Sequence, residues 1–302
     1  MTLLVAGLIN IEITLRIEGF PIAYTPVRYP FGGINSSVSG VGYNVAKALT
    51  ALGDAVDFLS LIGQDQARTM VYEALAAARI PAARVLATLP ATAHSVILYD
   101  GDGRRQINVD LKDVQRTVYP EDSAREALKA CDLAVLCNIN FARPLLRLAR
   151  AAGKLIATDV HAIQHLDDEY NRDYMAAAHI LFQSHENLLV SPEEWAQQLF
   201  QRYGTEIAVV GLGGAGALLA VRADHFCERL PAVRTRDIIN TIGAGDALFS
   251  AFIHSYQQTR DPYSALKKAM VFASYKIGEK GAADGFLDAA RLDALCAQVY
   301  GA

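Results

Sequence analysis

Hydrophobic residues along this chain fall into short continuous runs that alternate with longer amphipathic segments. The runs at 3–9, 56–62 and 133–137 have the length and the apolar character of buried parallel strands. Repeated strand-then-helix units predict an α/β fold, with a doubly wound, mostly parallel sheet flanked by helices on both faces. Further strand-like runs follow at 155–158, 179–182, 207–210 and 236–239.

Amphipathic helices are predicted between these strands. Residues 44–52 carry their apolar side chains on one face, and Gly53 ends the helix. Asp65 is the expected N-cap of another helix. Ser191 is followed by a proline and, three positions on, by a glutamate, which predicts a capped helix start; Asp261 opens the last long helix in a similar way. The other predicted helices span 123–130, 144–152, 192–202 and 247–258.

Two segments break this pattern because apolar and polar residues alternate in them. Residues 13–18 alternate strictly, which is typical of a half-exposed strand. Further on, two strand-like runs surround an Asp-Gly-Asp-Gly turn at 100–103, a strong hairpin signal. We therefore expect one small sheet beside the main sheet. The chain is predicted to be a single domain, 1–302, with a small β-sheet lid formed by insertions at about 12–36 and 93–110.

The composition allows a large core and excludes several classes of function. Of the 302 residues, 52% are hydrophobic, and the formal net charge of −4 gives no electrostatic footprint for nucleic acid or an anionic membrane. The run at 3–9 lacks a basic leader, and no stretch reaches membrane-spanning length. The cysteines lack metal-site spacing and suit reduced thiols. We expect a cytoplasmic protein with no nucleic acid partner and no membrane partner. The cysteines are Cys131, Cys137, Cys227 and Cys296.

The strongest candidate for chemistry is the stretch 240–249, where a glycine-rich turn precedes a predicted helix. The first N–H groups of a helix lack partners and carry partial positive charge, and glycine lets the backbone turn tightly before them. Gly243, Ala244 and Gly245 therefore predict a cradle for a phosphate. Asp246 lies at its edge, where it can take a proton from an attacking hydroxyl. In an arbitrary sequence, Asp246 would more often be a simple N-cap.

Residues 240–246 closely resemble the C-terminal signature of the ribokinase (PfkB) family of sugar and nucleoside kinases, Asp-Thr-x-Gly-Ala-Gly-Asp, with Asn240 in place of the first aspartate. Residues 40–46 resemble the family's N-terminal signature, although a glycine turn with Asn44 as N-cap explains them equally well on their own. The two signatures occur in the family's order, about 200 residues apart, and both β insertions fall where family members have them. The resemblance implies a ribokinase-like fold and an ATP-dependent kinase.

The resemblance also implies residues that bind the acceptor. Family members place an acidic residue after the first strand to bind acceptor hydroxyls, and Glu12 occupies that position. Asn44 matches the family's acceptor-binding asparagine, and Ser39 intrudes where relatives have a glycine. Asn138 and Asn140 are weaker candidates, since polar residues also cap strand ends. The candidate acceptor-binding residues are Asn10, Glu12, Ser39, Gly40, Asn44 and Asn140.

Residues 211–216, Gly-Leu-Gly-Gly-Ala-Gly, match the dinucleotide-binding fingerprint in spacing and follow a predicted strand. That pattern would indicate a nicotinamide-dependent dehydrogenase, but it requires a helix next, whereas 217–221 has the character of another strand. A hairpin turn explains the glycines better. The run also resembles the family's ATP-side loop Thr-Leu-Gly-x-x-Gly, with Leu212, Gly213 and Gly216 matching and a glycine in place of the threonine.

Two further departures from the family pattern concern ions. Many members carry Asn-x-x-Glu ahead of this loop, where it organises magnesium-bound phosphate; here Ser184 and Asn187 occupy those places, with Glu186 as the candidate substitute. The aspartate that Asn240 replaces helps to bind an activating monovalent cation in many relatives, so potassium activation is doubtful here. Mg²⁺ is expected to arrive with ATP, because it neutralises phosphate charge during transfer. Thr241 and Asn187 complete the nucleotide-binding candidates.

The sequence therefore predicts an ATP-dependent kinase that transfers the γ-phosphoryl group to a primary hydroxyl of a small sugar, as ribokinases and fructokinases do. Asp246 is the expected base, and the lid is expected to exclude water. An exposed sheet edge on the lid favours a homodimer. Three alternatives stay open: a nucleoside kinase of the adenosine, cytidine, inosine or pseudouridine type, a non-catalytic ligand-binding relative, and the dehydrogenase.

Overall fold

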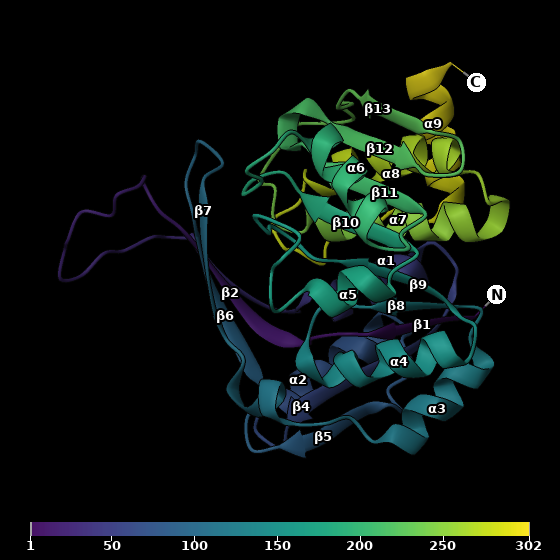
Figure 1. Cartoon of the computed structure of the whole chain (residues 1–302). Coiled ribbons are helices and arrows are strands. Elements are labelled where there is room, and N and C mark those ends of the chain that lie inside the picture. The colour runs from purple at the N-terminus through teal and green to yellow at the C-terminus, as the bar shows by residue number, and fades with distance from the viewer. Residues whose placement is uncertain (1, 302) are drawn as a thin grey trace.

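A nine-stranded sheet lies at the centre of the part of the chain that the computed structural model describes, residues 2–301 (Figure 1). Its strands, in spatial order, are β13 (Phe226–Leu230), β12 (Ala217–Val221), β11 (Ile207–Gly211), β10 (Ile180–Ser184), β9 (Leu155–Asp159), β8 (Leu133–Leu136), β1 (Thr2–Ala6), β4 (Ala55–Gly63) and β5 (Val85–Leu89). Neighbours from β11 to β5 are parallel, whereas β12 and β13 run antiparallel to their neighbours. The predicted mostly parallel sheet is confirmed, because strands buried on both faces need continuous apolar sequence.

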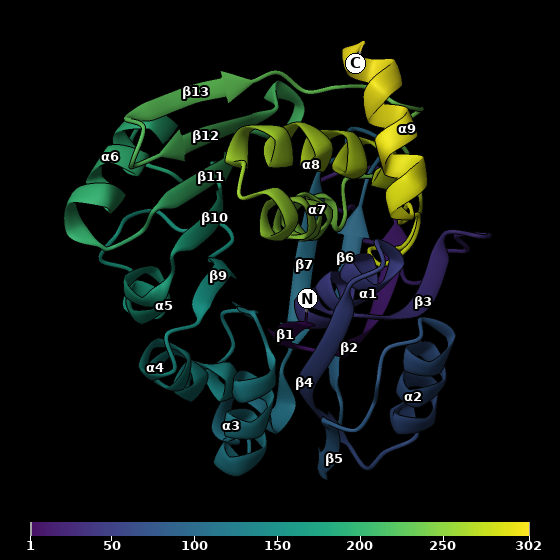
Figure 2. The same ribbon diagram turned by 90° about the vertical axis from the view of Figure 1, so that its right-hand side faces the viewer.

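Helices cover both faces of the sheet. Leu3 and Val5 of β1 belong to one hydrophobic core, while Leu4 and Ala6 belong to the other, so alternate residues of the strand point to opposite helix layers. One layer holds α1 (Val41–Ala51), α2 (Ala67–Ala77), α7 (Ala244–Thr259), α8 (Pro262–Lys276) and α9 (Ala289–Tyr300). The other holds α3 (Glu121–Ala130), α4 (Arg143–Ala151), α5 (Arg172–Ala177) and α6 (Pro192–Arg202), as Figure 2 shows. Within residues 2–301, none of these helices combines the length and apolar character that crossing a membrane requires.

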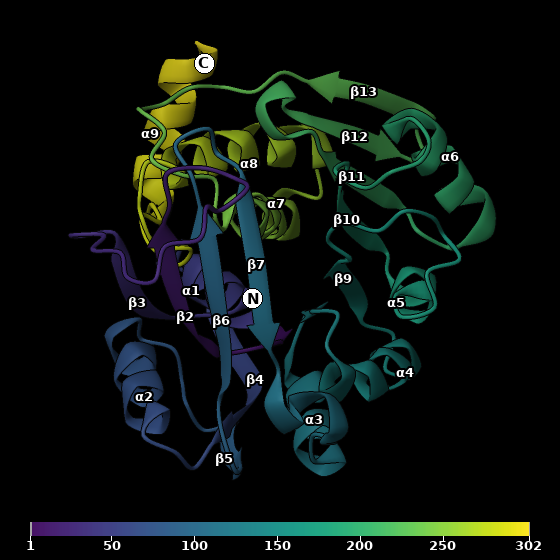
Figure 3. The ribbon, with the colours of Figure 1, turned by 90° about the vertical axis from the view of Figure 1, so that its left-hand side faces the viewer.

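A separate four-stranded sheet, counted over the same described range, stands beside the main domain and is called the lid below (Figures 1 and 3). Its strands, in spatial order, are β3 (Ile34–Ser39), β2 (Asn10–Arg16), β6 (Ala93–Tyr99) and β7 (Arg105–Asp110). β2 is antiparallel to β3 and parallel to β6, and β6 and β7 form an antiparallel hairpin. The hairpin predicted around the turn at 100–103 and the joining of both insertions in one sheet are confirmed.

The strand register fixes which side chains share each face of the lid. Ile97 is paired with Ile107, and Ile97 packs on Ile242 and Ala282 of the main domain, so this is the inner face. The inner face carries Asn10, Glu12, Ser39, Ser95, Ile97, Arg105, Ile107 and Val109. The outer face carries Ile13, Leu15, Ile34, Val96 and Leu98.

Three local predictions are wrong, the first two because a contact distant in the sequence decides the structure. Residues 236–239 form no strand, since their backbone meets the end of α8 instead of a sheet edge, with the Ile239 N–H donating to the Ile277 carbonyl at 2.9 Å. Asp65 does not cap α2, because its carboxylate accepts hydrogen bonds from the N–H and hydroxyl of Thr92, at 2.7 and 2.8 Å. The helix starting at Asp261 is not the last, because α9 follows it.

Candidate active site

The candidate phosphate turn lies at the start of α7, where Gly243 is the N-cap and Asp246 falls in the first helical turn. Gly243 has a φ of 76°, in the left-handed region that favours glycine. A Cβ at this position would lie 2.5 Å from the carbonyl oxygen of Ala282, so only glycine fits. The turn at Gly243 therefore packs directly against Ala282, in the segment that follows α8.

The space over the turn is open on the side that faces β9. A Cβ on Gly245 would meet only a carboxylate oxygen of Asp159, at 4.0 Å. The N–H of Ala244 already donates to the Thr241 carbonyl at 3.2 Å. The other amides of the turn and the positive end of the helix dipole suit this surface to an anion.

Two glycine contacts bring α1 against the start of the chain. A Cβ on Gly42 would lie 2.3 Å from the backbone of Gly7, and a Cβ on Gly40, which has a φ of 105°, would lie 2.6 Å from the carbonyl oxygen of Leu8. Helix α1 begins at Val41 with Gly40 as its N-cap, so Asn44 lies inside the helix. The alternative interpretation of Asn44 as a cap is therefore wrong, and its side chain points into the site.

A chain of hydrogen-bonding side chains joins the lid to the catalytic candidate. The amide Nδ2 of Asn44 donates to Oδ2 of Asp246 at 2.7 Å. The hydroxyl oxygen of Ser39 lies 3.2 Å from Oδ1 of Asn44 and 3.0 Å from Oε2 of Glu12. All four side chains are buried. Glu12 and Asp246, from opposite ends of the sequence, are thus linked through two intermediate residues.

Two buried polar atoms beside this chain have no partner within residues 2–301. They are Oδ1 of Asn10 and Oε1 of Glu12. The amide of Asn10 is held by its other end, which donates to the Ser95 hydroxyl at 2.7 Å. Buried polar atoms are normally hydrogen-bonded, so two orphaned acceptors on the inner face of the lid suit a ligand that carries hydroxyl groups.

Burial raises the pKa of Asp246 above its ordinary value. The hydrogen bond from Asn44 and the charges of His161 and Lys276 oppose this rise, while the neighbouring charge of Asp159 adds to it. A carboxylate with a raised pKa is a better proton acceptor than an exposed aspartate, provided that it stays ionised. The raised pKa therefore suits Asp246 to accept a proton while its carboxylate is ionised.

Burial also raises the pKa of Glu12, and the negative charge of Asp246 adds to the rise. The Ser39 hydroxyl and the charge of Lys276 oppose it, as does the nearby Ala282 amide, although no group meets hydrogen-bond geometry with Oε1. The two carboxyl groups therefore disfavour each other's ionisation.

Three residues of this site were not singled out from the sequence. Asp159 ends β9 and accepts the N–H of His161 at 2.8 Å; both lie where a predicted parallel strand ends, a signal that could have identified them. Lys276 is 0% exposed at the end of α8. No local sequence pattern predicts the burial of Lys276, because lysines in helices are usually exposed at the surface.

The glycine run at 211–216 forms a hairpin turn with a 3₁₀ segment, η3 (Gly213–Ala215), between β11 and the antiparallel β12. The N–H of Leu212 donates to the Gly216 carbonyl at 2.8 Å. Gly216 has a φ of 107°, and a Cβ there would lie 2.0 Å from the Leu230 carbonyl oxygen. Because a strand follows the turn, it lacks the helix N-terminus that a pyrophosphate-binding fingerprint needs, and the dehydrogenase alternative is wrong.

Arg105 of β7 joins the lid to residues that the sequence predicts to bind the nucleotide. Its guanidinium donates to the Thr241 hydroxyl at 3.0 Å and to Oε1 of Glu186 at 3.2 Å. Glu186 lies in the loop after β10, and in the same loop Asn187 donates to the Ala162 carbonyl at 3.2 Å. Arg105 thus brings the candidate residues Thr241 and Glu186 together, and Asn187 follows Glu186 in the same loop.

The polar atoms of Asn140 form hydrogen bonds outside the chain of side chains that leads to Asp246. Its backbone N–H and side-chain Nδ2 both donate to Gln115, at 3.0 and 2.9 Å, and its Oδ1 accepts from Arg143 at 3.4 Å. Asn138 donates to Asn171 at 2.9 Å. None of these bonds reaches the chain that leads to Asp246, so both asparagines have a structural role in the strand-end loops.

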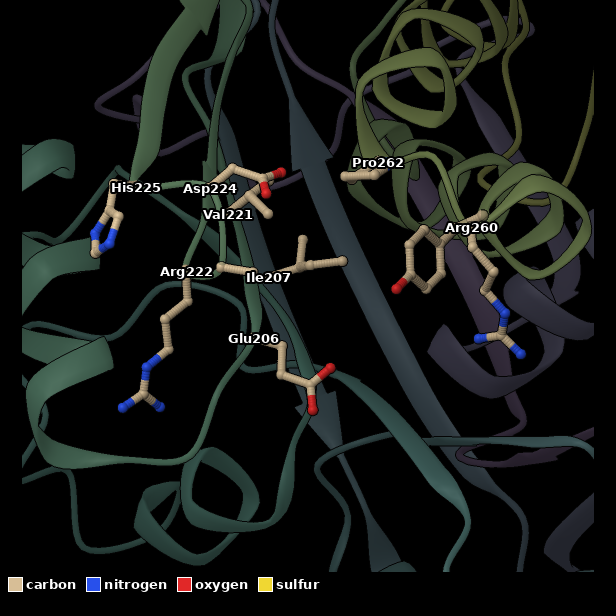
Figure 4. Close-up of a pocket in the computed structure, with 10 residues that line it drawn as sticks. Glu206, Ile207, Val221, Arg222, Asp224, His225, Arg260 and Pro262 are labelled. Atoms are coloured by element: carbon tan, nitrogen blue, oxygen red, sulfur yellow. The ribbon is translucent and has the colours of Figure 1, made fainter.

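Two surface hollows lie away from this cluster. One, of 580 Å³, is lined by the amino end of β11, the β12–β13 turn and the α7–α8 connection (Figure 4). It therefore lies at the opposite end of β11 from the glycine run. Arg222 and Arg260 point away from each other in Figure 4. Another of 340 Å³ lies along α4 and α5.

Residues 2–289 match a known family model, described as pfkB family carbohydrate kinase. An ATP-dependent ribose-1-phosphate kinase of Halopiger xanaduensis is 25% identical over 280 residues, which cover 92% of each chain. A deoxyribokinase of Salmonella typhi is 27% identical, over 80% of this chain and 82% of its own. The solved structure of the microbiome-derived acarbose kinase Mak1 matches with a TM-score of 0.87 and 26% identity, over 98% of both chains. The fold expected from the two signatures is confirmed.

Proposed function

Because the chain belongs to the pfkB family of carbohydrate kinases, and is thus an ATP-dependent kinase, we propose that it phosphorylates a primary hydroxyl of a small sugar. One observation carries this proposal: the buried chain of side chains from Glu12 through Ser39 and Asn44 to Asp246. It joins a polar pocket under the lid to the start of α7, the surface suited to phosphate. The relatives described as ribose-1-phosphate kinase, deoxyribokinase and acarbose kinase support a sugar as the acceptor.

In the proposed step, the carboxylate of Asp246 takes the proton of the acceptor hydroxyl. The acceptor oxygen bonds to the γ-phosphorus of ATP, and the bond to the leaving ADP oxygen breaks. Asn44 holds Oδ2 of Asp246, which leaves Oδ1 for the acceptor. The amides of Gly243 and Gly245 and the dipole of α7 stabilise the charge on the phosphoryl group.

The acceptor is proposed to bind between the inner face of the lid and the start of α1. The orphaned oxygens of Asn10 and Glu12 accept from its hydroxyl groups, which gives each buried acceptor a donor. Ser39 and Asn44 complete the pocket, and the glycine at 40 keeps the backbone close. Asn140 is left out of this site because its polar atoms are already bonded.

ATP is proposed to lie along the η3 turn, against Leu212, Gly213 and Gly216, with its phosphates directed to Thr241 and the start of α7. Mg²⁺ would neutralise phosphate charge there. Among residues 2–301, no group of three or more His, Cys, Asp or Glu side chains gathers into a metal-binding cluster. We therefore propose that Mg²⁺ is carried by the nucleotide, with Glu186 as the nearest candidate carboxylate and Asn187 beside it.

The Asp246→Asn variant tests this mechanism. Asparagine keeps the size of the side chain and can still accept from Asn44, but it cannot take up a proton, so kcat should fall by about two to four orders of magnitude. The affinity for ATP, measured by calorimetry, should change little. Asp237, exposed and paired with Arg234, provides the control variant Asp237→Asn. Near-normal turnover of Asp246→Asn would remove Asp246 from the step.

A nucleoside kinase is the second candidate, and the inner face of the lid favours it. Ile107 and Val109 are 50% and 48% exposed on this face, where they would pack against a base. A screen of pentoses, hexoses, sugar phosphates and nucleosides, read out by ADP release, separates the two candidates. Turnover with nucleosides alone would overturn the sugar proposal, and no turnover with any acceptor would overturn both.

We also propose that the chain works as one domain and forms a homodimer in the cytoplasm. The outer face of the lid supports the dimer, because Ile34 and Val96 are exposed there beside Ile13, Leu15 and Leu98. Figure 1 shows the β2–β3 connection extending beyond the main domain, and it carries exposed aromatic side chains. A second copy of the lid would cover these residues. The free cysteines support a reducing compartment.

A further inference from the structure

The proposed reaction gives no role to Lys276, the fully buried lysine at the end of α8. Its ammonium group donates a hydrogen bond to the carbonyl oxygen of Ile242. That carbonyl directly precedes Gly243, the N-cap of α7. A lysine is rarely buried completely, because desolvating an ammonium costs several kcal/mol unless the charge is compensated. The buried ammonium group is compensated in part by its hydrogen bond to the residue that precedes the phosphate turn.

Backbone carbonyls converge around this lysine and Asn240. The Nδ2 of Asn240 donates to the carbonyls of Lys280, at 2.9 Å, and Glu279, at 3.3 Å. Its Oδ1 accepts the N–H of Ile242 at 3.0 Å, which fixes the orientation of the amide. Three carbonyl oxygens from two segments are thus each bonded to a side-chain N–H.

Clustered carbonyl oxygens are the ligands that a potassium ion prefers in proteins. Here the side-chain N–H groups of Asn240 and the ammonium group of Lys276 already donate to those oxygens. The carbonyls are therefore not available to coordinate a monovalent cation. Asn240 is neutral and adds no negative charge that would balance such an ion. The positive charge beside the Ile242 carbonyl is the ammonium group of Lys276.

The acidic side chains around Lys276 come from several elements. They are Asp246 of α7, Glu12 of β2, and Asp284 and Glu279 of the segment after α8. The lysine in turn favours the ionised forms of Asp246 and Glu12. Its charge therefore lies between the proposed base, the acceptor pocket and the phosphate turn, and it compensates the excess of buried carboxylates.

We propose that Lys276 is a built-in cation: a positioning residue that holds the Ile242 carbonyl and the phosphate turn, so that this kinase needs no monovalent metal ion. The inference rests on the proposed kinase activity but concerns its cation requirement. It predicts that turnover of the unmodified protein differs by less than about twofold between K⁺ and tetramethylammonium at equal ionic strength, with an unchanged Tm. A K⁺-dependent rise in turnover or Tm would overturn it.

Two variants test the lysine directly. Lys276→Met removes the charge, fills the space and leaves the Ile242 carbonyl unpaired, so kcat should fall about 10- to 100-fold, with no recovery in K⁺. Lys276→Ala leaves room for an ion; kcat should fall similarly, then recover about tenfold in K⁺ or NH₄⁺, and K⁺ should raise its Tm. Lys268 lies on the same helix but pairs with Asp293 near the surface at 2.5 Å, so Lys268→Met is the matched control.

The outcomes separate this inference from the proposed function. Full turnover of Lys276→Met overturns the inference, and so does a folded Lys276→Ala that responds to K⁺ in neither turnover nor Tm. If Lys276→Ala does not fold, the unmodified protein and Lys276→Met decide. If the unmodified protein phosphorylates no acceptor, the proposed function fails, while the Tm measurements in K⁺ and tetramethylammonium still test whether Lys276 replaces a bound ion.

A pH profile provides a readout that a purely structural role would not move. Burial lowers the pKa of Lys276 to about 8, although the surrounding carboxylates oppose this shift. The ammonium should therefore lose its proton as the pH rises through about 8, and kcat should fall over that interval. Lys276→Met should lack this alkaline limb. An identical limb in both proteins would overturn the assignment.

Discussion

The hydrogen bonds of Ser39 bear on the protonation state of Glu12. The serine has one hydroxyl hydrogen, yet its oxygen lies within bonding distance of Oε2 of Glu12 and Oδ1 of Asn44. Because Asn44 donates its amide N–H to Asp246, its Oδ1 must accept from Ser39. Either the Ser39 hydrogen is shared between the two oxygens, or a protonated Glu12, whose pKa is raised by burial, donates the second hydrogen. We therefore predict that Glu12 holds a proton when no acceptor is bound.

This assignment makes Glu12→Gln a mild substitution. Glutamine can donate an N–H to Ser39 as the protonated acid does, so the acceptor KM should stay within about threefold of the unmodified value. Glu12→Ala removes both the donor and the orphaned acceptor and should raise KM about tenfold or more, with basal ATP hydrolysis unchanged. Steady-state kinetics with the acceptor found by the screen measure both effects. Glu18, an exposed residue just beyond β2, serves as the control in Glu18→Gln.

The opposite result would have a clear meaning. If Glu12→Gln raised KM as much as Glu12→Ala, Glu12 would act as an ionised acceptor. The raised pKa also has a signature in stability: the folded protein keeps this proton to higher pH than the unfolded chain, so the group's contribution is lost as pH rises through the raised pKa. Glu12→Gln should lack that slope in thermal unfolding between acidic and neutral pH.

At the scale of elements, β7 connects the lid to the nucleotide edge. Arg105 reaches Thr241 and Glu186, so a phosphate bound at the start of α7 would lie close to its guanidinium. Arg105→Gln should raise the KM for ATP about tenfold, because it removes one charged contact. The adjacent Arg104 pairs with Asp100 in the hairpin turn, and Arg104→Gln should leave that KM within about twofold. Equal effects of both variants would exclude a specific contact of Arg105 with phosphate.

The elements also show which predictions local sequence supports. Ser191 does cap α6, with its hydroxyl accepting the N–H of Glu194 at 3.2 Å, and the helix spans the predicted residues. A cap, a proline and an apolar face all act within a few residues, so sequence reasoning suffices. Asp65 has the same chemistry, but its carboxylate meets Thr92, 27 positions later. A local signal fails where a distant partner competes for the same group.

At the scale of the whole molecule, the apolar outer face of the lid predicts association. If two copies pair through this face, Val96→Asp should place a charge in the contact and convert the dimer to a monomer in sedimentation velocity experiments. Leu189 is exposed before α6 and does not belong to the outer face of the lid, so Leu189→Asp is the control that should remain dimeric. A protein that stays monomeric at all concentrations would contradict the proposed homodimer.

The sequence alone determined the layered α/β fold, the lid hairpin and the glycine turn with its aspartate, since these follow from apolar periodicity and backbone preferences within short segments. It also suggested Glu12, Ser39 and Asn44 by resemblance. Only the tertiary structure decided how they connect: Asn44 and Asp246 are 202 positions apart, and Lys276 is 34 positions from the carbonyl it holds. Hydrogen-bond partners and buried charges depend on distances across the fold, and no local pattern contains those distances.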